Sequence, residues 1–357
     1  MALNNIISLL FVVLFGFVFT KYLLFFFKKI NTNLLIDNQF NKPQAFHKNA
    51  IPRLGGIILY CLLAIIFGYL YFFKNIFSLE YIYFCSFFFI LGLIDDLKIN
   101  IPPKFRLIIM SIFLVALITS NDIQINKTGL EFLDNLIAID IFALIFICLC
   151  FLFIINGSNL IDGFNGLLSI HSLIVLITLL AINLVNENNS ISFILLYTSL
   201  FILIFIKFNF PKAQLFLGDS GAYLIGSLIA ISVIQTSNLN PLVSPFFFCV
   251  LLFYLFFEVF FSFFRKILIT RQSPLLPDNK HLHMLLYKLL FKKYQKNLYS
   301  NYMVSVYINL IYFILLMPAI FFMENGLFCR YYFFGLMVFY TYFYKIFYKK
   351  VKQNQSI

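Results

Sequence analysis

The chain has 357 residues, of which 62% are hydrophobic and 11% are charged, and its net charge is +12 at pH 7. Soluble domains have about 25% charged residues, so the composition excludes a soluble protein, because so few charges could not cover a surface that faces water. The net charge alone would suit a nucleic-acid-binding protein, but the placement of the basic residues excludes that class.

The apolar residues occur in blocks of roughly 20 residues, the length of a helix that crosses a bilayer. Polar clusters separate eleven such blocks. We therefore predict an all-α, polytopic integral membrane protein with about eleven transmembrane helices in a single domain over residues 1–357. The predicted spans are 4–27, 53–73, 79–94, 105–120, 137–155, 164–185, 190–208, 213–235, 242–264, 302–323 and 328–346.

Most of the 26 basic residues follow every second span. Because loops rich in Lys and Arg stay in the cytoplasm, we predict an N-terminus outside the membrane and a cytoplasmic C-terminus. Basic residues beside the membrane also attract anionic lipid headgroups. The placement therefore predicts membrane lipids as partners and no nucleic acid.

The predicted cytoplasmic loops differ from the external segments because acidic residues, amides, histidines and glycines gather in them. External segments such as NLVNENNS and TSNLNPL are short and have no basic residues. We therefore expect a functional site at the cytoplasmic ends of the helices. The loops that would form it are 28–52, 95–104, 156–166, 207–221 and 265–301.

The first polar pair in these loops is Asp95-Asp96, at the end of an apolar span. Adjacent carboxylates repel each other and resist burial. The pair is either a solvated helix end or a site where a divalent cation or a cationic partner offsets the repulsion. The basic residues that follow, Lys98, Lys104 and Arg106, suit a site that also handles phosphate.

The segment NGSNLIDGFNGL follows another span. Asn159, Asp162 and Asn165 are each three residues apart, so a helix would align them on one face. The glycines between them permit a turn or a close backbone approach. A turn rich in Asn and Gly is the simpler interpretation.

The segment FLGDSGAYLIG directly precedes a predicted span. Asp219 is either the N-cap of that helix or a ligand. Phe216 could stack on a planar base, and the start of a helix favours bound phosphate.

The segment PDNKHLHM contains His281 and His283, which would diverge in a helix and share a side in an extended loop. Zinc is disfavoured, because no cysteine or third histidine is near in the sequence. Phosphate contacts suit Lys280 and Arg271 nearby. Glu258 lies inside a span, where a carboxylate is costly, so it is a candidate functional residue.

In this order, LGLIDD, NGSNLIDGFNGL, FLGDSGAYLIGS and PDNKHLH resemble the signature segments of the polyprenyl-phosphate N-acetylhexosamine-1-phosphate transferases. This is glycosyltransferase family 4, which includes the WecA and MraY types. IPRLGG after the first span also matches a family segment. The resemblance covers residues 46–288, and the later spans match only in being hydrophobic.

The resemblance implies a single transmembrane catalytic domain in a bacterial inner membrane, with its active site on the cytoplasmic face. Its members transfer a sugar 1-phosphate from a UDP-sugar to a polyprenyl phosphate, usually undecaprenyl phosphate, and release UMP. The implied cofactor is Mg²⁺, with Mn²⁺ as an alternative ion. The implied partners are a UDP-N-acetylhexosamine and undecaprenyl phosphate, and a homodimer stays open.

Roles follow from the matching motifs. Asp219 would be a metal ligand with Asn159 as the second, and Asp95 and Asp96 would lie beside the pyrophosphate. One of these two would orient or deprotonate the lipid phosphate. Uracil would contact Asn165 and Phe216, and Asp162 and Arg271 would also bind substrate. The catalytic set would be completed by Lys104, His281 and His283, which would contact phosphates or sugar.

Departures from the family pattern bear on the substrate. KHLHML lacks the run of His followed by Phe-Glu that MraY types carry, so we favour UDP-N-acetylglucosamine over the muramyl-pentapeptide substrate. The product would start a surface polysaccharide, such as lipopolysaccharide, or a cell-envelope glycan. A phospho-N-acetylmuramoyl-pentapeptide transferase is the alternative within the family. A membrane transporter is the alternative from another class, but its polar residues would lie near the membrane midplane.

Overall fold

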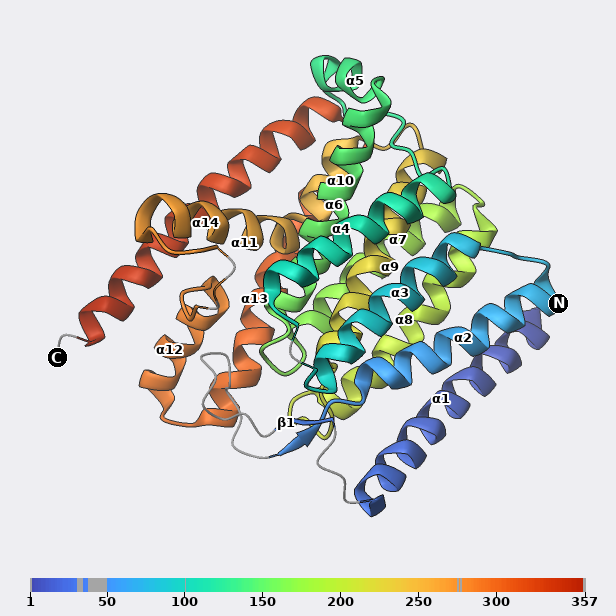
Figure 1. Cartoon of the computed structure of the whole chain (residues 1–357), viewed down its shortest axis with the longest axis horizontal. Coiled ribbons are helices and arrows are strands. Elements are labelled where there is room, and N and C mark those ends of the chain that lie inside the picture. Colours follow the sequence, from blue (N-terminus) through green and yellow to red (C-terminus); the bar gives the residue numbers. More distant parts are fainter. Residues whose placement is uncertain are drawn as a thin grey trace.

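The computed structural model describes residues 2–30, 35–37, 50–99, 101–274, 276 and 278–355 (Figure 1). This part of the chain is a bundle of helices with one short antiparallel pair of strands, β1 (Ile36–Asp37) and β2 (Ile51–Pro52). The helices are α1 (Ala2–Ile30), α2 (Gly55–Lys74), α3 (Leu79–Asp96), α4 (Pro103–Ser120), α5 (Glu131–Ile137), α6 (Asp140–Ile161), α7 (Leu167–Val185), α8 (Asn189–Asn209), α9 (Gly218–Leu239), α10 (Pro245–Leu251), α11 (Phe253–Phe264), the π-helix η1 (Arg265–Thr270), α12 (Leu282–Tyr294), α13 (Asn297–Phe321) and α14 (Gly326–Gln355).

The structure confirms an all-α, multi-pass membrane protein. Within the described residues, eight helices are long and apolar enough to cross a membrane. A ninth candidate is broken, because α10 and Phe253–Ile269 meet at an angle of 74°. A helix also lies at the two other predicted spans, but α3 carries three carboxylates and α14 is rich in tyrosine and lysine. Because of these polar residues, α3 and α14 are not among the candidate membrane spans.

The ends of the bundle differ in what they carry. Figure 1 shows β1 and α12 at one end and α5 at the opposite end. The predicted alternation puts the same segments on opposite sides of the membrane. Which end faces the cytoplasm stays a prediction from the basic residues.

Helix α9 lies at the centre of the bundle, packed against α2, α3 and α6. A larger share of α9 is buried than of any other candidate span. Without a hydrophobic driving force between helices in lipid, close packing requires small residues at the contacts. Gly92 of α3 and Gly56 of α2 meet this need, because a Cβ on either would collide with the backbone of α9 at Asp219 or Gly221. The first turn of α9 is therefore held against two neighbouring helices.

Candidate functional site

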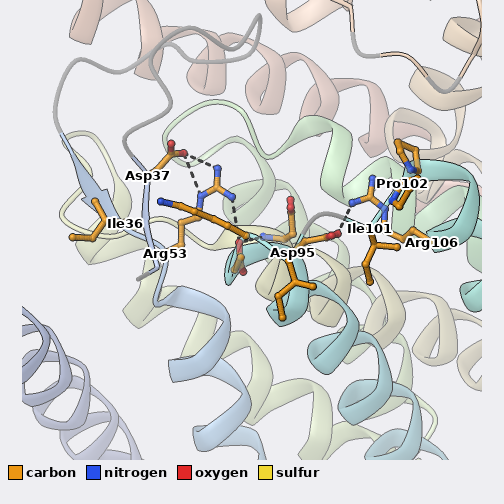
Figure 2. A pocket seen from close by; sticks show the side chains of 12 residues that line it. Ile36, Asp37, Arg53, Asp95, Ile101, Pro102 and Arg106 are labelled. Carbon is orange, nitrogen blue, oxygen red and sulfur yellow. Dashed lines mark hydrogen bonds and ion pairs between the residues drawn. The ribbon is translucent and has the colours of Figure 1, made fainter. Parts of the chain in front are cut away.

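A cavity of about 390 Å³ opens where α3 ends and where α4 and α9 begin. Carboxylates and cations line it together, with an apolar rim of isoleucine and proline (Figure 2). The lining residues are Ile36, Asp37, Arg53, Asp95, Asp96, Lys98, Ile99, Ile101, Pro102, Pro103, Arg106 and Asp219.

Asp96 caps the start of α9. Its side chain accepts hydrogen bonds from the backbone N–H groups of Asp219 at 3.0 Å and Ser220 at 2.9 Å, and from the Ser220 hydroxyl at 2.6 Å. The first amides of a helix have no partner within the helix, so an acceptor there stabilises it. The interpretation of Asp219 as the N-cap is therefore wrong, because Leu217 is at that position and the capping carboxylate comes from α3.

Asp219 points its carboxylate toward the end of α6. Its Oδ1 accepts a hydrogen bond from Asn159 Nδ2 at 2.6 Å. The two residues are 60 positions apart in the sequence, and the close packing of α6 on α9 brings them together. Asp219 is partly exposed and lines the cavity, so its carboxylate can reach a ligand there.

Arg53 joins the segment before α2 to the end of α3. It donates from Nη2 to Asp37 at 2.8 Å and from Nη1 to Asp96 at 3.3 Å (Figure 2). The backbone around it pairs with the segment before α9, since Phe216 N–H donates to the carbonyl of Pro52 and Gly55 N–H donates to that of Phe216. The IPRLGG and FLGD motifs therefore form one wall. Sequence reasoning gave Arg53 no role, although the IPRLGG match was the signal that could have found it.

Asp95 turns away from Asp96 and forms an ion pair with Arg106 of α4 (Figure 2). The guanidinium of Arg106 also lies over the ring of Tyr223, 5.9 Å from its centre. The two adjacent carboxylates thus diverge toward two different cations. This arrangement bears out the cationic-partner interpretation of the pair rather than the solvated helix end.

Asp162 follows the last residue of α6 and lies close to the same carboxylates. Burial, and then the charge of Asp219, raise the pKa of Asp162 well above its ordinary value. The raised pKa means that Asp162 resists carrying a second negative charge beside Asp219. A cation bound beside Asp219 would relieve that repulsion.

Asn165 does not share a helical face with Asn159, so the spacing argument was wrong at this point. The chain leaves the helix after Ile161. The buried Asn165 side chain donates to the carbonyl of Pro211 at 2.9 Å, and its backbone N–H donates to Asn301 Oδ1 at 2.9 Å. Within the described contacts, Asn165 ties its loop to neighbouring elements and does not line the cavity.

Asn159, Asp162 and three other predicted site residues also lie outside the cavity wall. Phe216 is partly buried in the segment that pairs with Pro52. Lys104 is exposed in the first turn of α4, and Arg271 is exposed just after η1. Of the three basic residues that the sequence analysis named after Asp96, Lys98 and Arg106 line the cavity and Lys104 does not.

His281 and His283 lie in a buried cluster. His281 is not yet helical, so its ring stacks on that of His283, with centres 5.5 Å apart and planes within 4°. His281 Nδ1 lies 3.0 Å from Glu258, and His283 Nδ1 lies 3.1 Å from the hydroxyl of Tyr254. Burial lowers the pKa of His283 to about 4. Neither histidine lines the cavity.

Comparison with known proteins places the sequence in a family. The pattern of glycosyl transferase family 4 matches residues 78–237. A phospho-N-acetylmuramoyl-pentapeptide-transferase of Dictyoglomus thermophilum is 31% identical over 245 residues, which are 64% of this chain and 74% of the relative. The chain belongs to glycosyl transferase family 4.

Two further relatives carry the other activity name. The undecaprenyl-phosphate alpha-N-acetylglucosaminyl 1-phosphate transferase of Thermotoga maritima is 27% identical over 237 residues, 66% of this chain and 68% of the relative. A probable undecaprenyl-phosphate N-acetylglucosaminyl 1-phosphate transferase of Bacillus subtilis is 28% identical over 198 residues, 54% of each. The resemblance stated from the motifs is therefore confirmed.

The family-matched region runs from α3 to α9 and contains Asp95, Asp96, Asn159 and Asp219. Arg53 and the histidine cluster lie outside it. The four acids and amides of the candidate site therefore lie inside the matched region, whereas Arg53 and the histidine cluster come from the rest of the chain.

A metal site of Mg²⁺ type is compatible with that centre. Across the described ranges, no three His, Cys, Asp or Glu side chains are placed to hold an ion. Mg²⁺, however, usually takes one or two carboxylates together with waters and substrate phosphates. Asp219 and Asn159 offer a carboxylate and an amide in contact with each other. Turning the amide about its last bond would present its oxygen in place of its nitrogen.

Proposed function

We propose that the chain transfers N-acetylhexosamine 1-phosphate, GlcNAc 1-phosphate in the first instance, from a UDP-sugar to undecaprenyl phosphate and releases UMP. The relatives from Thermotoga maritima and Bacillus subtilis carry names for this reaction. The observation that carries the proposal is Asp219, which lines one cavity with the guanidinium groups of Arg53 and Arg106 and accepts a hydrogen bond from Asn159.

In this reaction an oxygen of the acceptor phosphate attacks the phosphorus that carries the sugar. The bond from that phosphorus to the bridging oxygen breaks, and the electron pair leaves with UMP. Two anionic substrates must approach each other, so the site has to neutralise phosphate oxygens. Arg53, Arg106 and Lys98 line the cavity from three directions and would bind those oxygens.

We propose that Asp219 and Asn159 hold Mg²⁺. When bound, the ion would neutralise pyrophosphate charge and act as a Lewis acid on the phosphoryl oxygens. Asp95 and Asp96, the two acids of the IDD motif, would then have separate roles. Asp96 is saturated by the first turn of α9 and orients Asp219, whereas Asp95 shares Arg106 with the cavity and is placed to orient the acceptor phosphate.

A second candidate within the family is transfer of phospho-N-acetylmuramoyl-pentapeptide. The observation in its favour is the name of two Dictyoglomus relatives, at 31% and 30% identity. The reaction at phosphorus is the same, so the difference lies only in the sugar. The assay below includes both donors.

We place the cavity at the cytoplasmic face of a bacterial inner membrane. The relatives named above are bacterial, and UDP-sugars are cytoplasmic substrates in the reaction that we propose. The acidic residues of the cavity gather at one end of the bundle. A transporter would instead place such groups near the midplane.

The test uses the purified full chain in lipid nanodiscs with Mg²⁺, undecaprenyl phosphate and a panel of UDP-sugars that includes UDP-GlcNAc and UDP-N-acetylmuramoyl-pentapeptide. We expect UMP release with UDP-GlcNAc, its loss on chelation, and its recovery when Mg²⁺ is added. Asp219→Ala should abolish release without unfolding the chain. The matched control is Asp122→Ala, an exposed acid outside the cavity.

Two results would contradict the proposal. One is UMP release by well-folded Asp219→Ala at the rate of the unchanged chain. The other is the absence of UMP release from every donor in the panel. Release from the pentapeptide donor alone would select the second candidate.

A further inference from the structure

The carboxy-terminal helix α14 supplies two tyrosine hydroxyls to the buried histidine cluster. Tyr340 donates to Glu258 Oε2 at 2.5 Å. One turn along the helix, Tyr344 donates to the carbonyl of Lys280 at 3.0 Å. The helix lies outside the family-matched residues 78–237, and its sequence suggested only a hydrophobic span.

Glu258 of α11 links this helix to the histidines. It is 1% exposed. While Oε2 accepts from Tyr340, Oε1 accepts from the backbone N–H of Leu282 at 3.2 Å and lies 3.0 Å from His281 Nδ1. A buried carboxylate is tolerated only where such partners replace its lost water, so the loss of one partner weakens the whole arrangement.

The other side of His281 is also held. Its Nε2 lies 3.3 Å from Asp278 Oδ1, and Asp278 Oδ2 accepts from Arg265 Nη2 at 2.7 Å. The ring therefore lies between two carboxylates on different elements. Its position is set by α11, η1 and α14 together.

Ring contacts connect His281 to the loop that follows α6. The His281 ring stacks on that of His283, and the His283 ring meets that of Phe164 edge to face, with centres 5.8 Å apart. Phe164 stands two residues after Asp162, in the loop that leaves α6. The last turn of α6 carries Asn159, the partner of Asp219.

We propose that Tyr340 is a positioning residue, which holds Glu258 and His281 so that the loop after α6 keeps Asn159 and Asp162 in place beside Asp219. It touches no substrate in this arrangement. The inference rests on the proposed function for its kinetic consequence, but its structural content is independent of the reaction.

The variant that tests it is Tyr340→Phe, which removes the hydroxyl and keeps the ring. The matched control is Tyr342→Phe on the same helix, where the side chain is 61% exposed. Loss of a hydrogen bond to a buried charged group leads us to expect a decrease in kcat of about tenfold for Tyr340→Phe. The KM for the UDP-sugar should change less than kcat, and Tyr342→Phe should match the unchanged chain.

Coupling separates positioning from a general loss of packing. If Tyr340 acts through Glu258, then Tyr340→Phe should have little further effect on kcat in a Glu258→Gln background. Effects that multiply independently would overturn the inference. Equal kcat values for Tyr340→Phe and the unchanged chain would do the same.

Hydrogen exchange gives a readout that needs no turnover. Backbone amides in 159–166 and in 278–283 should exchange faster in Tyr340→Phe than in Tyr342→Phe, because loosened contacts permit local opening. Unchanged exchange in 159–166 would overturn the inference even if the chain is active. If no donor releases UMP, the proposed function fails, while the exchange experiment still decides the role of Tyr340.

Discussion

The Asp96 carboxylate receives the backbone amide of Asp219, so the second acid of the IDD motif fixes the residue that we assign to the metal. The same carboxylate also takes up both donors of Ser220 and one nitrogen of Arg53. These two acids, which are 123 positions apart in the sequence, therefore differ in what they can do. Asp96 is fully used in structure, and Asp219 keeps its carboxylate at the cavity.

The first prediction separates these two acids. Asp96→Asn places an amide nitrogen where the carboxylate accepted hydrogen bonds, so it should lower the free energy of unfolding by about 1–3 kcal/mol and also reduce turnover. Asp219→Asn should abolish turnover with a much smaller loss of stability. Thermal unfolding and UMP release, measured on both variants, check this. An Asp96→Asn chain as stable as the unchanged one would show that the cap is unimportant.

Arg53 is the subject of the second prediction. Its planar fork bridges Asp37 and Asp96 through separate nitrogens, a geometry that a lysine cannot reproduce. Arg53→Lys should therefore keep the charge but lose most activity, about tenfold, and Arg53→Gln should lose more activity and stability. Steady-state kinetics with varied UDP-sugar would measure the difference. Full activity in Arg53→Lys would mean that charge alone is required.

Helix packing beneath the site gives the third prediction. A Cβ at Gly92 would collide with the backbone of Asp219 and Ser220, whereas nothing lies within 4 Å of one at Gly68. Gly92→Ala should therefore displace α3 from α9, cost about 1–3 kcal/mol or more, and reduce turnover. Gly68→Ala on α2 is the matched control and should be neutral or stabilising by about 0.5–1 kcal/mol. Melting temperatures of the two variants decide the matter.

The fourth prediction concerns pH. Burial lowers the pKa of His283 to about 4, below its ordinary value of 6.5. Between these two pH values the unfolded chain binds a proton at His283 and the folded chain does not. Stability from this residue is complete above about pH 6.5 and falls as the pH decreases toward 4. The melting temperature should therefore fall less steeply with acid in His283→Asn than in the unchanged chain. Parallel slopes for the two proteins would contradict this assignment.

The sequence predicts the architecture well because membrane insertion depends on residue composition over long blocks. A helix lies at each predicted span, and the ordered motifs led to the family. Asp219 and Asn159, which the family resemblance implies as ligands of one metal ion, lie in contact with each other. The spans and the motifs depend on local chemistry that a single segment carries, whereas the two proposed metal ligands were paired only through the family resemblance.

Features that depend on contacts between segments were less predictable. Arg53 entered the sequence analysis only as one of many basic residues, because nothing in its own segment shows that Asp37 and Asp96 converge on it. Asn165 was misplaced because α6 ends at Ile161, before the helical spacing reaches it. Tyr340 was invisible, since its partner Glu258 lies 82 residues away.

The glycine contacts of α2 and α3 with α9 press main chain against main chain beside Asp219, which lines the cavity. At these backbone contacts there is no side chain that natural variation could alter. Changes in donor preference among related proteins would then have to arise at the rim, where isoleucine and proline stand. The chemistry at phosphorus could stay constant while the sugar that it handles diverges.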